Sequence, residues 1–143
     1  MNFGQLKMYI EGELVSSVNN VTKEIYSPLN DERIATLSWA NSLDSERALK
    51  SAEQGFDTWS KTPVKKRKEW MLILRDKILE KEKILRKSIS YEMGKPYNAT
   101  AEDVESITNS LKYYSDIIED YQKDKEIIDP DGTHSHHLVS KPI

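Results

Sequence analysis

All three histidines of the chain lie within four positions of one another, at His134, His136 and His137. Imidazole is a common metal ligand, so such a cluster could hold a transition metal. If this segment is a β-strand, His134 and His136 share one face of it, because side chains alternate between the two faces. We expect no nearby carboxylate or thiol to complete a coordination shell. A solvent-exposed or intersubunit strand is therefore favoured over a metal site.

Other residue types that carry chemistry are missing or widely spaced. The chain has no cysteine, which excludes disulfides, thiolate zinc sites, iron–sulfur clusters and thiol nucleophiles. Its five glycines are never closer than eight residues, so neither a G-x-G-x-x-G loop nor a Walker loop is present. No G-x-S-x-G elbow surrounds a serine, and the histidines have no evident acid–base partner. We predict no catalytic and no cofactor-binding residue within these 143 residues.

The composition limits the possible partners and locations. Charged residues make up 31% of the chain and hydrophobic residues 37%, with a net charge of -3. The basic run at 65–68 is compensated by nearby acids, so nucleic acid is not an expected partner. The longest apolar run, WMLIL at 70–74, is too short to cross a bilayer, and the amino terminus lacks a signal peptide. The length permits one domain, but the low apolar content favours a helix-rich piece of something larger, which we expect to be cytoplasmic and without a membrane partner.

The first forty residues have the alternation of β-strands. Residues 7–15 predict a hairpin turning at Glu11 and Gly12, where glycine can take a positive φ. A second hairpin is predicted from 23–26 and 33–39, with the turn at Asn30 and Asp31. These two hairpins are the only β-structure we expect before the end of the chain.

From Asp44 onward the period becomes helical. Asp44 is the predicted N-cap of a first helix, and Thr62 is the predicted cap of a second that starts at Pro63. A third helix over 82–93 should end at Gly94, the residue best suited to a left-handed cap. The predicted buried stripes include the aromatic side chains of Phe56, Trp59, Trp70 and Tyr114.

The fourth predicted helix has the most regular apolar stripe, from Val104 to Tyr121 at steps of three and four. A polar segment, 122–132, then leads to an extended strand over 133–141. The chain as a whole is predicted to be α/β, with two short β-hairpins, about four α-helices and a C-terminal extended strand. We expect the stripe of the fourth helix to stay partly uncovered in the isolated chain, which would then self-associate.

Four short patterns occur in a fixed order before a helix that contains Tyr113 and Tyr114: YIEGE at 9–13, SPLN at 27–30, GFDTW at 55–59 and EMGKP at 92–96. This order and spacing resemble the beginning of an NAD(P)-dependent aldehyde dehydrogenase, from about Met8 to the last residue. The resemblance implies an aldehyde dehydrogenase-like α/β fold. It assigns 1–132 to the first part of the dinucleotide-binding domain and 133–143 to the start of an arm that crosses to a neighbouring subunit.

The resemblance also implies a function for a longer protein. Such an enzyme oxidises a small-molecule aldehyde to a carboxylic acid with NAD or NADP, by way of a cysteine thiohemiacetal, and acts as a homo-oligomer. The family's dinucleotide loop, catalytic glutamate and cysteine would follow Ile143, so we expect this fragment to be inactive and to bind no cofactor. The GFDTW and EMGKP patterns resemble the succinate-semialdehyde or lactaldehyde dehydrogenase branches.

Four residues of this chain take possible site roles from the resemblance. Glu92 and a backbone carbonyl near Ile25 correspond to positions that hold a structural monovalent cation in some family members, an oxygen set that suits a hard cation. An ordinary surface hydrogen bond is the alternative for Glu92. Alignment through Tyr113 places Glu102 and Ser106 at the mouth of the substrate tunnel. Counting from the EMGKP pattern shifts the register by one residue, which favours an exposed helix face.

A second class of function competes with the enzyme fragment. A free-standing helical module could keep this scaffold and bind a partner protein through its exposed stripes. Such a module should end at a cap or a turn, whereas this sequence ends within an expected strand at Lys141, Pro142 and Ile143. We therefore favour a piece of a longer dehydrogenase.

Overall fold

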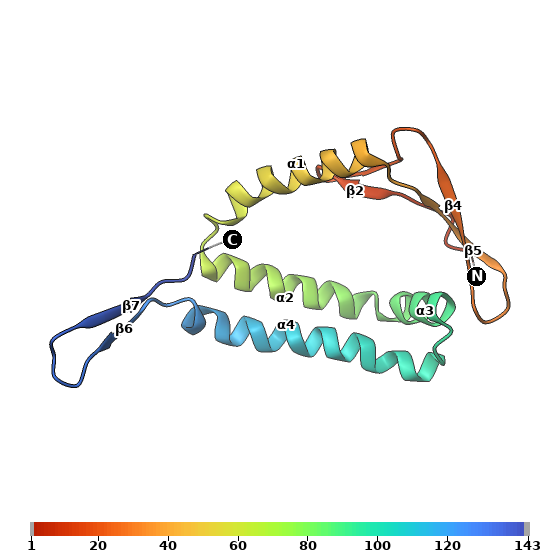
Figure 1. Cartoon of the computed structure of the whole chain (residues 1–143). Helices are drawn as coiled ribbons and strands as arrows, with labels where there is room; N and C mark the ends of the chain where they lie inside the picture. Colours follow the sequence, from red (N-terminus) through yellow and green to blue (C-terminus); the bar gives the residue numbers. More distant parts are fainter. Residues whose placement is uncertain (1, 142–143) are drawn as a thin grey trace.

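The computed structural model describes residues 2–141. Five short strands form its first part: β1 (Gln5–Leu6), β2 (Met8–Ile10), β3 (Glu13–Val15), β4 (Thr22–Tyr26) and β5 (Arg33–Ser38). The helices α1 (Ser42–Trp59), α2 (Val64–Glu80), α3 (Glu82–Met93) and α4 (Ala101–Tyr121) follow, with a 3-10 turn η1 (Tyr97–Thr100) before α4. A last pair of strands, β6 (Lys125–Ile128) and β7 (Ser135–Leu138), extends away from the helices (Figure 1).

Both predicted N-terminal hairpins are present. Strands β2 and β3 pair antiparallel, with Tyr9 opposite Leu14, and the turn places Glu11 and Gly12 at positive φ. Strands β4 and β5 pair antiparallel with Ile25 opposite Ala35. Strand β1 was not predicted. It adds to the free edge of β5 in parallel, with Leu6 beside Leu37, so that the second hairpin becomes a three-stranded sheet.

The first helix begins with a capping box, and its N-cap is Asn41 rather than the predicted Asp44. The side chain of Asn41 accepts a hydrogen bond from the Asp44 amide at 3.1 Å, and the Asp44 carboxylate accepts one from the Asn41 amide at the same distance. Asp44 is therefore the third helical residue, where an acidic side chain completes the box. Its carboxylate also accepts from the Val18 amide, which ties the loop after β3 to the helix.

The predicted threonine cap of the second helix is wrong. Pro63 is the residue before α2, and the hydroxyl of Thr62 donates backward to the Thr58 carbonyl at 3.0 Å. The turn between α1 and α2 is held instead by Arg67, whose guanidinium donates to the carbonyls of Thr62 and Ser60 at 3.0 and 3.2 Å. One arginine thus satisfies carbonyls that the end of α1 leaves without helical partners.

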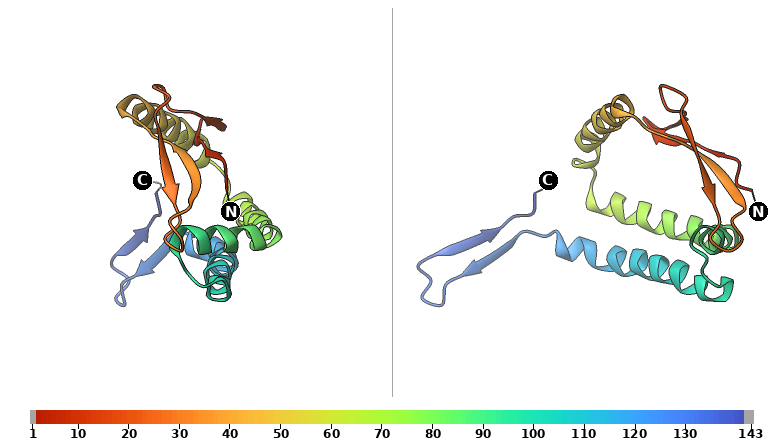
Figure 2. Two further views of the ribbon diagram at one scale, coloured as in Figure 1. Left: turned by 90° about the vertical axis from the view of Figure 1, so that its right-hand side faces the viewer. Right: turned by 45° about the vertical axis from the view of Figure 1, so that its right-hand side comes forward.

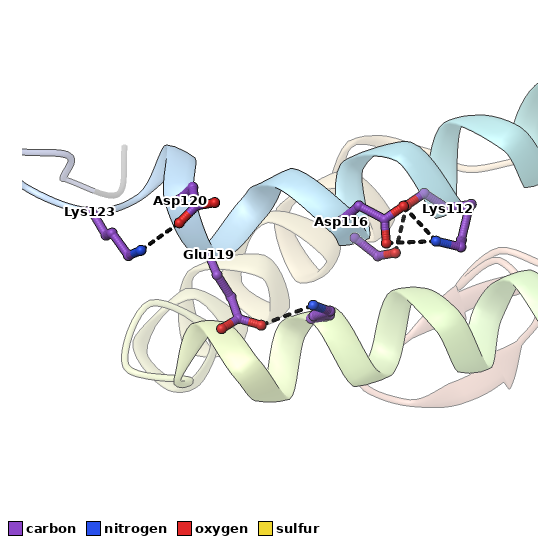
Figure 3. Close-up of polar contacts among 7 residues, drawn as sticks. Lys112, Asp116, Glu119, Asp120 and Lys123 are labelled. Carbon is purple, nitrogen blue, oxygen red and sulfur yellow. Dashed lines mark hydrogen bonds and ion pairs between the residues drawn. The ribbon is translucent and has the colours of Figure 1, made fainter.

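Helices α2 and α4 lie side by side along most of their length, and α1 arches away from them (Figures 1 and 2). Val104, Thr108 and Ser115 are the buried residues of α4. An ion pair of 3.0 Å joins Lys68 on α2 to Glu119 on α4, and Figure 3 shows Glu119 reaching across between the two helices. The pair lies near the end of α4 that leads to β6.

The hydrophobic core of the described residues is small. Only Ile10, Ile34, Ala35 and Val104 are buried hydrophobic residues among them. The predicted burial of the aromatic stripes is wrong here, since Phe56, Trp59, Trp70 and Tyr114 are 43%, 50%, 52% and 56% exposed. Their helical spacing does create apolar faces, but the described elements leave about half of each of these side chains exposed. The prediction that the stripe of α4 stays partly uncovered is confirmed by the exposure of Ile107 and Tyr121.

The expected C-terminal strand is present as β7 but is not alone. Strand β6 arises from the segment that was expected to be only polar, and it pairs antiparallel with β7. The turn places Gly132 at positive φ, and the Asp129 amide donates to the His134 carbonyl at 2.9 Å. Every residue of both strands is exposed, so this third hairpin projects from the helices without covering them (Figure 2).

Candidate functional site

The turn of the β4–β5 hairpin docks on the C-terminal end of α3. Ser27, which is fully buried, donates its hydroxyl to the Tyr91 carbonyl at 2.7 Å and accepts the Leu29 amide at 3.3 Å. Gly94 ends the helix in the left-handed conformation, with φ of 73°, as predicted. A Cβ at Gly94 would lie 3.2 Å from Cγ of Pro28. The glycine thus allows both the helix cap and the close approach of the hairpin.

Replacing Gly94 with alanine is expected to lower the free energy of unfolding by about 2 kcal/mol, because a Cβ is strained at positive φ. The contact with Pro28 adds to this strain. Urea denaturation of the chain measures the effect. Gly55→Ala is the matched control, since Gly55 lies within α1 with no neighbour near its would-be Cβ, and that variant should be more stable by about 0.5 kcal/mol. Equal effects of the two substitutions on the free energy of unfolding would contradict the left-handed helix cap at Gly94.

This docking brings Ile25 and Glu92 to one cavity between the sheet and α3. The cavity measures about 230 Å³. Glu92 and Ser88 line it from successive turns of α3, and the other lining residues are apolar: Phe3, Leu6, Ile25, Ile34, Ala35 and Leu37. The two residues proposed for a cation from the sequence therefore line the same cavity, although 67 positions separate them in the chain. The cavity has an apolar floor and one acidic side chain.

Glu92 of the cavity differs in its partners from Glu24, an acidic residue that does not line the cavity. Glu24, next to Ile25 on β4, forms an ion pair of 2.6 Å with Arg33. The Tyr26 hydroxyl donates to the same carboxylate, and this hydrogen bond, together with Arg33, holds the pKa of Glu24 below its ordinary value. Glu92 is exposed, and within residues 2–141 no lysine, arginine or histidine forms an ion pair with it. Glu92 therefore presents a solvent-exposed carboxylate without an ion-pair partner among residues 2–141.

The lysine of the EMGKP pattern has a structural partner. Lys95 forms an ion pair of 2.7 Å with Asp103 in the first turn of α4, and both side chains are partly buried. Beside it, Arg86 of α3 donates to the Tyr97 carbonyl of η1 at 3.2 Å. These contacts fix the path of the chain from α3 into α4.

Glu102 and Ser106 lie four residues apart on α4, and both are exposed. Neither lines the cavity of Ile25 and Glu92. Neither side chain makes a hydrogen bond or ion pair to another described residue. The structure thus places them on an open helix face, and a tunnel mouth at this position needs walls from outside the described residues.

The expectation of no carboxylate near the histidines is wrong. Asp129 lies 3.2 Å from His136 and 3.6 Å from His134, and Glu126 lies 3.7 Å from His137. The cause is the unpredicted strand β6, which carries Glu126 and brings Asp129 to the same end of the hairpin. Even so, no group of three or more His, Asp or Glu residues among 2–141 has the geometry to hold a metal ion.

Ser88 is the polar cavity residue that sequence reasoning missed. It precedes Glu92 by four positions on a helix whose bounds were predicted correctly, so the two share a face. That spacing was visible in the sequence, but the opposing wall, made by β1 and β5, was not.

Among the described residues no helix is long and apolar enough to cross a membrane.

Comparison with known proteins adds the family. The profile of the Aldehyde dehydrogenase family matches residues 15–143. Malonate-semialdehyde dehydrogenase 2 of Bacillus cereus is 34% identical over 93 residues, which are 65% of this chain and 19% of that protein. D-glyceraldehyde dehydrogenase (NADP(+)) of Thermoplasma acidophilum is 27% identical over 133 residues, 93% of this chain and 26% of that protein.

Solved structures agree with the fold. A mutant of apo betaine aldehyde dehydrogenase from Staphylococcus aureus superposes with a TM-score of 0.84 at 29% identity, covering 95% of this chain and 27% of that one. Another mutant of the same enzyme, in complex with NAD+, gives 0.79 at 30% identity and covers 87% and 25%. The predicted aldehyde dehydrogenase-like α/β fold is confirmed.

The chain spans about a fifth to a quarter of the length of these relatives. No comparison supports the free-standing interaction module. The family profile covers nearly the whole sequence, from Val15 onward, and the chain therefore belongs to the aldehyde dehydrogenase family.

Proposed function

We propose that this chain is the first part of an enzyme that oxidises an aldehyde to a carboxylic acid with NAD+ or NADP+. The observation that carries the proposal is the family match over 15–143 together with the superposition on an NAD+-bound relative. These 143 residues supply no nucleophilic cysteine and no glycine-rich phosphate loop. In this proposal residues 1–132 form the N-terminal part of the dinucleotide-binding domain.

The proposed substrate is a small aldehyde of the succinate-semialdehyde or lactaldehyde kind, the first of which carries one carboxylate besides its aldehyde. The GFDTW and EMGKP patterns support this branch, and several relatives are named for malonate semialdehyde. The enzyme that contains this segment should reduce NAD+ or NADP+ when a semialdehyde is added, measured by absorbance of the reduced nicotinamide. Faster turnover with betaine aldehyde than with either semialdehyde would overturn the substrate proposal.

We further propose that the enzyme is a cytoplasmic homo-oligomer and that 133–143 begins the arm that reaches a neighbouring subunit. Support comes from the β6–β7 hairpin, which lies apart from the helices with both outer edges unpaired within the described residues. Isolated two-stranded hairpins are marginal in water, so such a hairpin benefits from a neighbour. Pro142 and Ile143 of the arm lie outside the described residues.

Glu92 and a backbone carbonyl near Ile25 are proposed to hold a monovalent cation. Both residues line one cavity, and the Glu92 carboxylate has no ion-pair partner among residues 2–141. KCl should therefore raise the melting temperature of the chain beyond the effect of tetramethylammonium chloride at equal ionic strength. Glu92→Gln should abolish this difference, whereas Glu102→Gln, on the open face of α4, should keep it. A difference that survives in Glu92→Gln would contradict the site.

A further inference from the structure

The cavity between α3 and the β1–β5–β4 sheet is larger than a cation needs. The cavity opens to solvent, since Glu92 is exposed and Leu6 is 42% exposed, and its volume of about 230 Å³ is larger than the roughly 150 Å³ of an enclosed engineered cavity that binds benzene. Six of its eight lining residues are apolar, contributed by the N-terminal segment and by β4 and β5. Burying a hydrocarbon group against this wall is favourable by about 25 cal/mol for each Å² removed from water. The cavity can thus accept an apolar body as well as an ion.

The polar side of the cavity contains hydrogen-bond acceptors. Glu92 offers a carboxylate, and Ser88, one turn earlier, directs its hydroxyl hydrogen to the Ile84 carbonyl at 2.9 Å. The lone pairs of the Ser88 oxygen stay available for a donor from the cavity. An ammonium group has three N–H donors and no acceptor, so it complements these two side chains. A carboxylate ligand would be repelled, and a neutral alcohol would lack the charge.

We propose that this cavity binds a small organic ammonium compound, with its hydrocarbon body against the sheet and its NH3+ group between Glu92 and Ser88. The apolar lining favours the hydrocarbon body, and the Glu92 carboxylate, which has no ion-pair partner among residues 2–141, favours the ammonium group. The proposal goes beyond the dehydrogenase function and does not require it. It rests on Glu92 as the monovalent-cation proposal does, but it requires the apolar wall, which an inorganic ion does not.

Benzylammonium is the test probe, and benzyl alcohol and benzoate are its neutral and anionic counterparts. Saturation-transfer NMR titrations on the 143-residue chain give the three dissociation constants. Benzylammonium should bind about fivefold more tightly than benzyl alcohol, the value of one solvent-accessible ion pair, and benzoate should not bind. Glu92→Gln should remove the advantage of benzylammonium while benzyl alcohol binds as before. Equal binding of all three probes, or an advantage that survives in Glu92→Gln, would overturn the proposal.

Ser88→Leu tests the cavity itself by filling it from the α3 side. The variant should lose binding of benzylammonium and benzyl alcohol alike, at least tenfold, while Ser110→Leu on the exposed face of α4 should bind both as the unchanged chain does. Where Ser88→Leu fails to fold, intermolecular NOEs in the unchanged chain decide. NOEs from the benzyl ring to the methyl groups of Leu6, Ile25 and Leu37 support the site, and NOEs only to other residues overturn it.

The two proposals that use Glu92 fail in different ways. Stabilisation by KCl without any preference for benzylammonium would leave the inorganic cation site standing and overturn the organic one. Benzylammonium binding without a KCl effect would support the organic-ammonium site and overturn the inorganic cation site. If both hold, KCl should weaken benzylammonium binding, because both cations use the same carboxylate. If Ser88→Leu keeps the KCl effect but loses benzylammonium binding, the inorganic ion then needs only Glu92, and the organic ligand also needs the apolar cavity.

Discussion

Replacing Asp44 with alanine should lower the free energy of unfolding by about 3 kcal/mol, because two backbone amides lose their acceptor. Asp44 is only 1% exposed, and its carboxylate accepts the Val18 and Asn41 amides at 3.1 Å each. The change also removes the acidic side chain from the first turn of α1. There the carboxylate interacts favourably with the helix dipole and completes the capping box. Urea denaturation followed by circular dichroism measures the loss.

Two further variants sharpen this test. Asp44→Asn keeps one oxygen acceptor but loses the charge, and it should be less stable than the unchanged chain by about 1 kcal/mol. Asp57→Ala alters an exposed aspartate near the other end of α1 and should change stability by less than about 0.5 kcal/mol. A loss at Asp44 no larger than the one at Asp57 would show that the loop of Val18 is not held by this carboxylate.

The isolated chain should self-associate, and the extent should rise with concentration. Among the described residues only four hydrophobic side chains are buried, while Trp70 of α2 and Ile107 of α4 are each 52% exposed. Exposed apolar surface of this extent favours association, since contact between copies removes it from water. Light scattering after size-exclusion chromatography, over a hundredfold range of concentration, should give an apparent mass that increases from the monomer value.

The surface responsible can be tested by substitution. The double variant Trp70→Ser and Ile107→Ser should shift the mass toward that of the monomer. The matched variant Glu69→Ser and Glu105→Ser changes exposed polar neighbours on the same helices and should associate as the unchanged chain does. A monodisperse monomer at every concentration would contradict the expectation, and so would equal behaviour of the two variants.

Local sequence signals predicted the helices well. The bounds of α3 and its glycine cap follow from apolar spacing and from the conformational freedom of Gly94. The cap of α1 was displaced by three residues because Asn41 and Asp44 form one reciprocal box, and both residue types favour an N-cap. Residue type alone therefore does not show which of the two residues is the N-cap.

Elements that depend on distant partners were harder to predict. Strand β6 has the sequence KEII, in which the two apolar residues are adjacent, so it lacks the alternation of a half-buried strand. Strand β6 is defined by its pairing with β7. The same pairing places Asp129 beside His134 and His136. Helical periodicity likewise locates the apolar faces of Phe56 and Trp70 but does not tell what covers them.

The candidate site likewise has a part that was predicted from the sequence and a part that was not. Glu92 and Ile25 came from the resemblance to the family, and the structure places both on one cavity. The apolar wall opposite Glu92, to which Ile25 belongs, depends also on β1, a strand of two residues that pairs with β5 across 31 positions of sequence. Pairing over such a separation leaves no local signal, which is why the volume and apolar character of the cavity were not predicted.

The most direct test of the fragment assignment is the nicotinamide assay on the isolated 143-residue chain. The chain is incubated with NAD+ or NADP+ and succinate semialdehyde or malonate semialdehyde, and dinucleotide binding is measured in parallel by calorimetry. We predict no reduced nicotinamide above the protein-free control and no saturable binding, because the chain has no cysteine and no glycine-rich phosphate loop. Aldehyde-dependent reduction in proportion to the concentration of the chain would contradict the assignment.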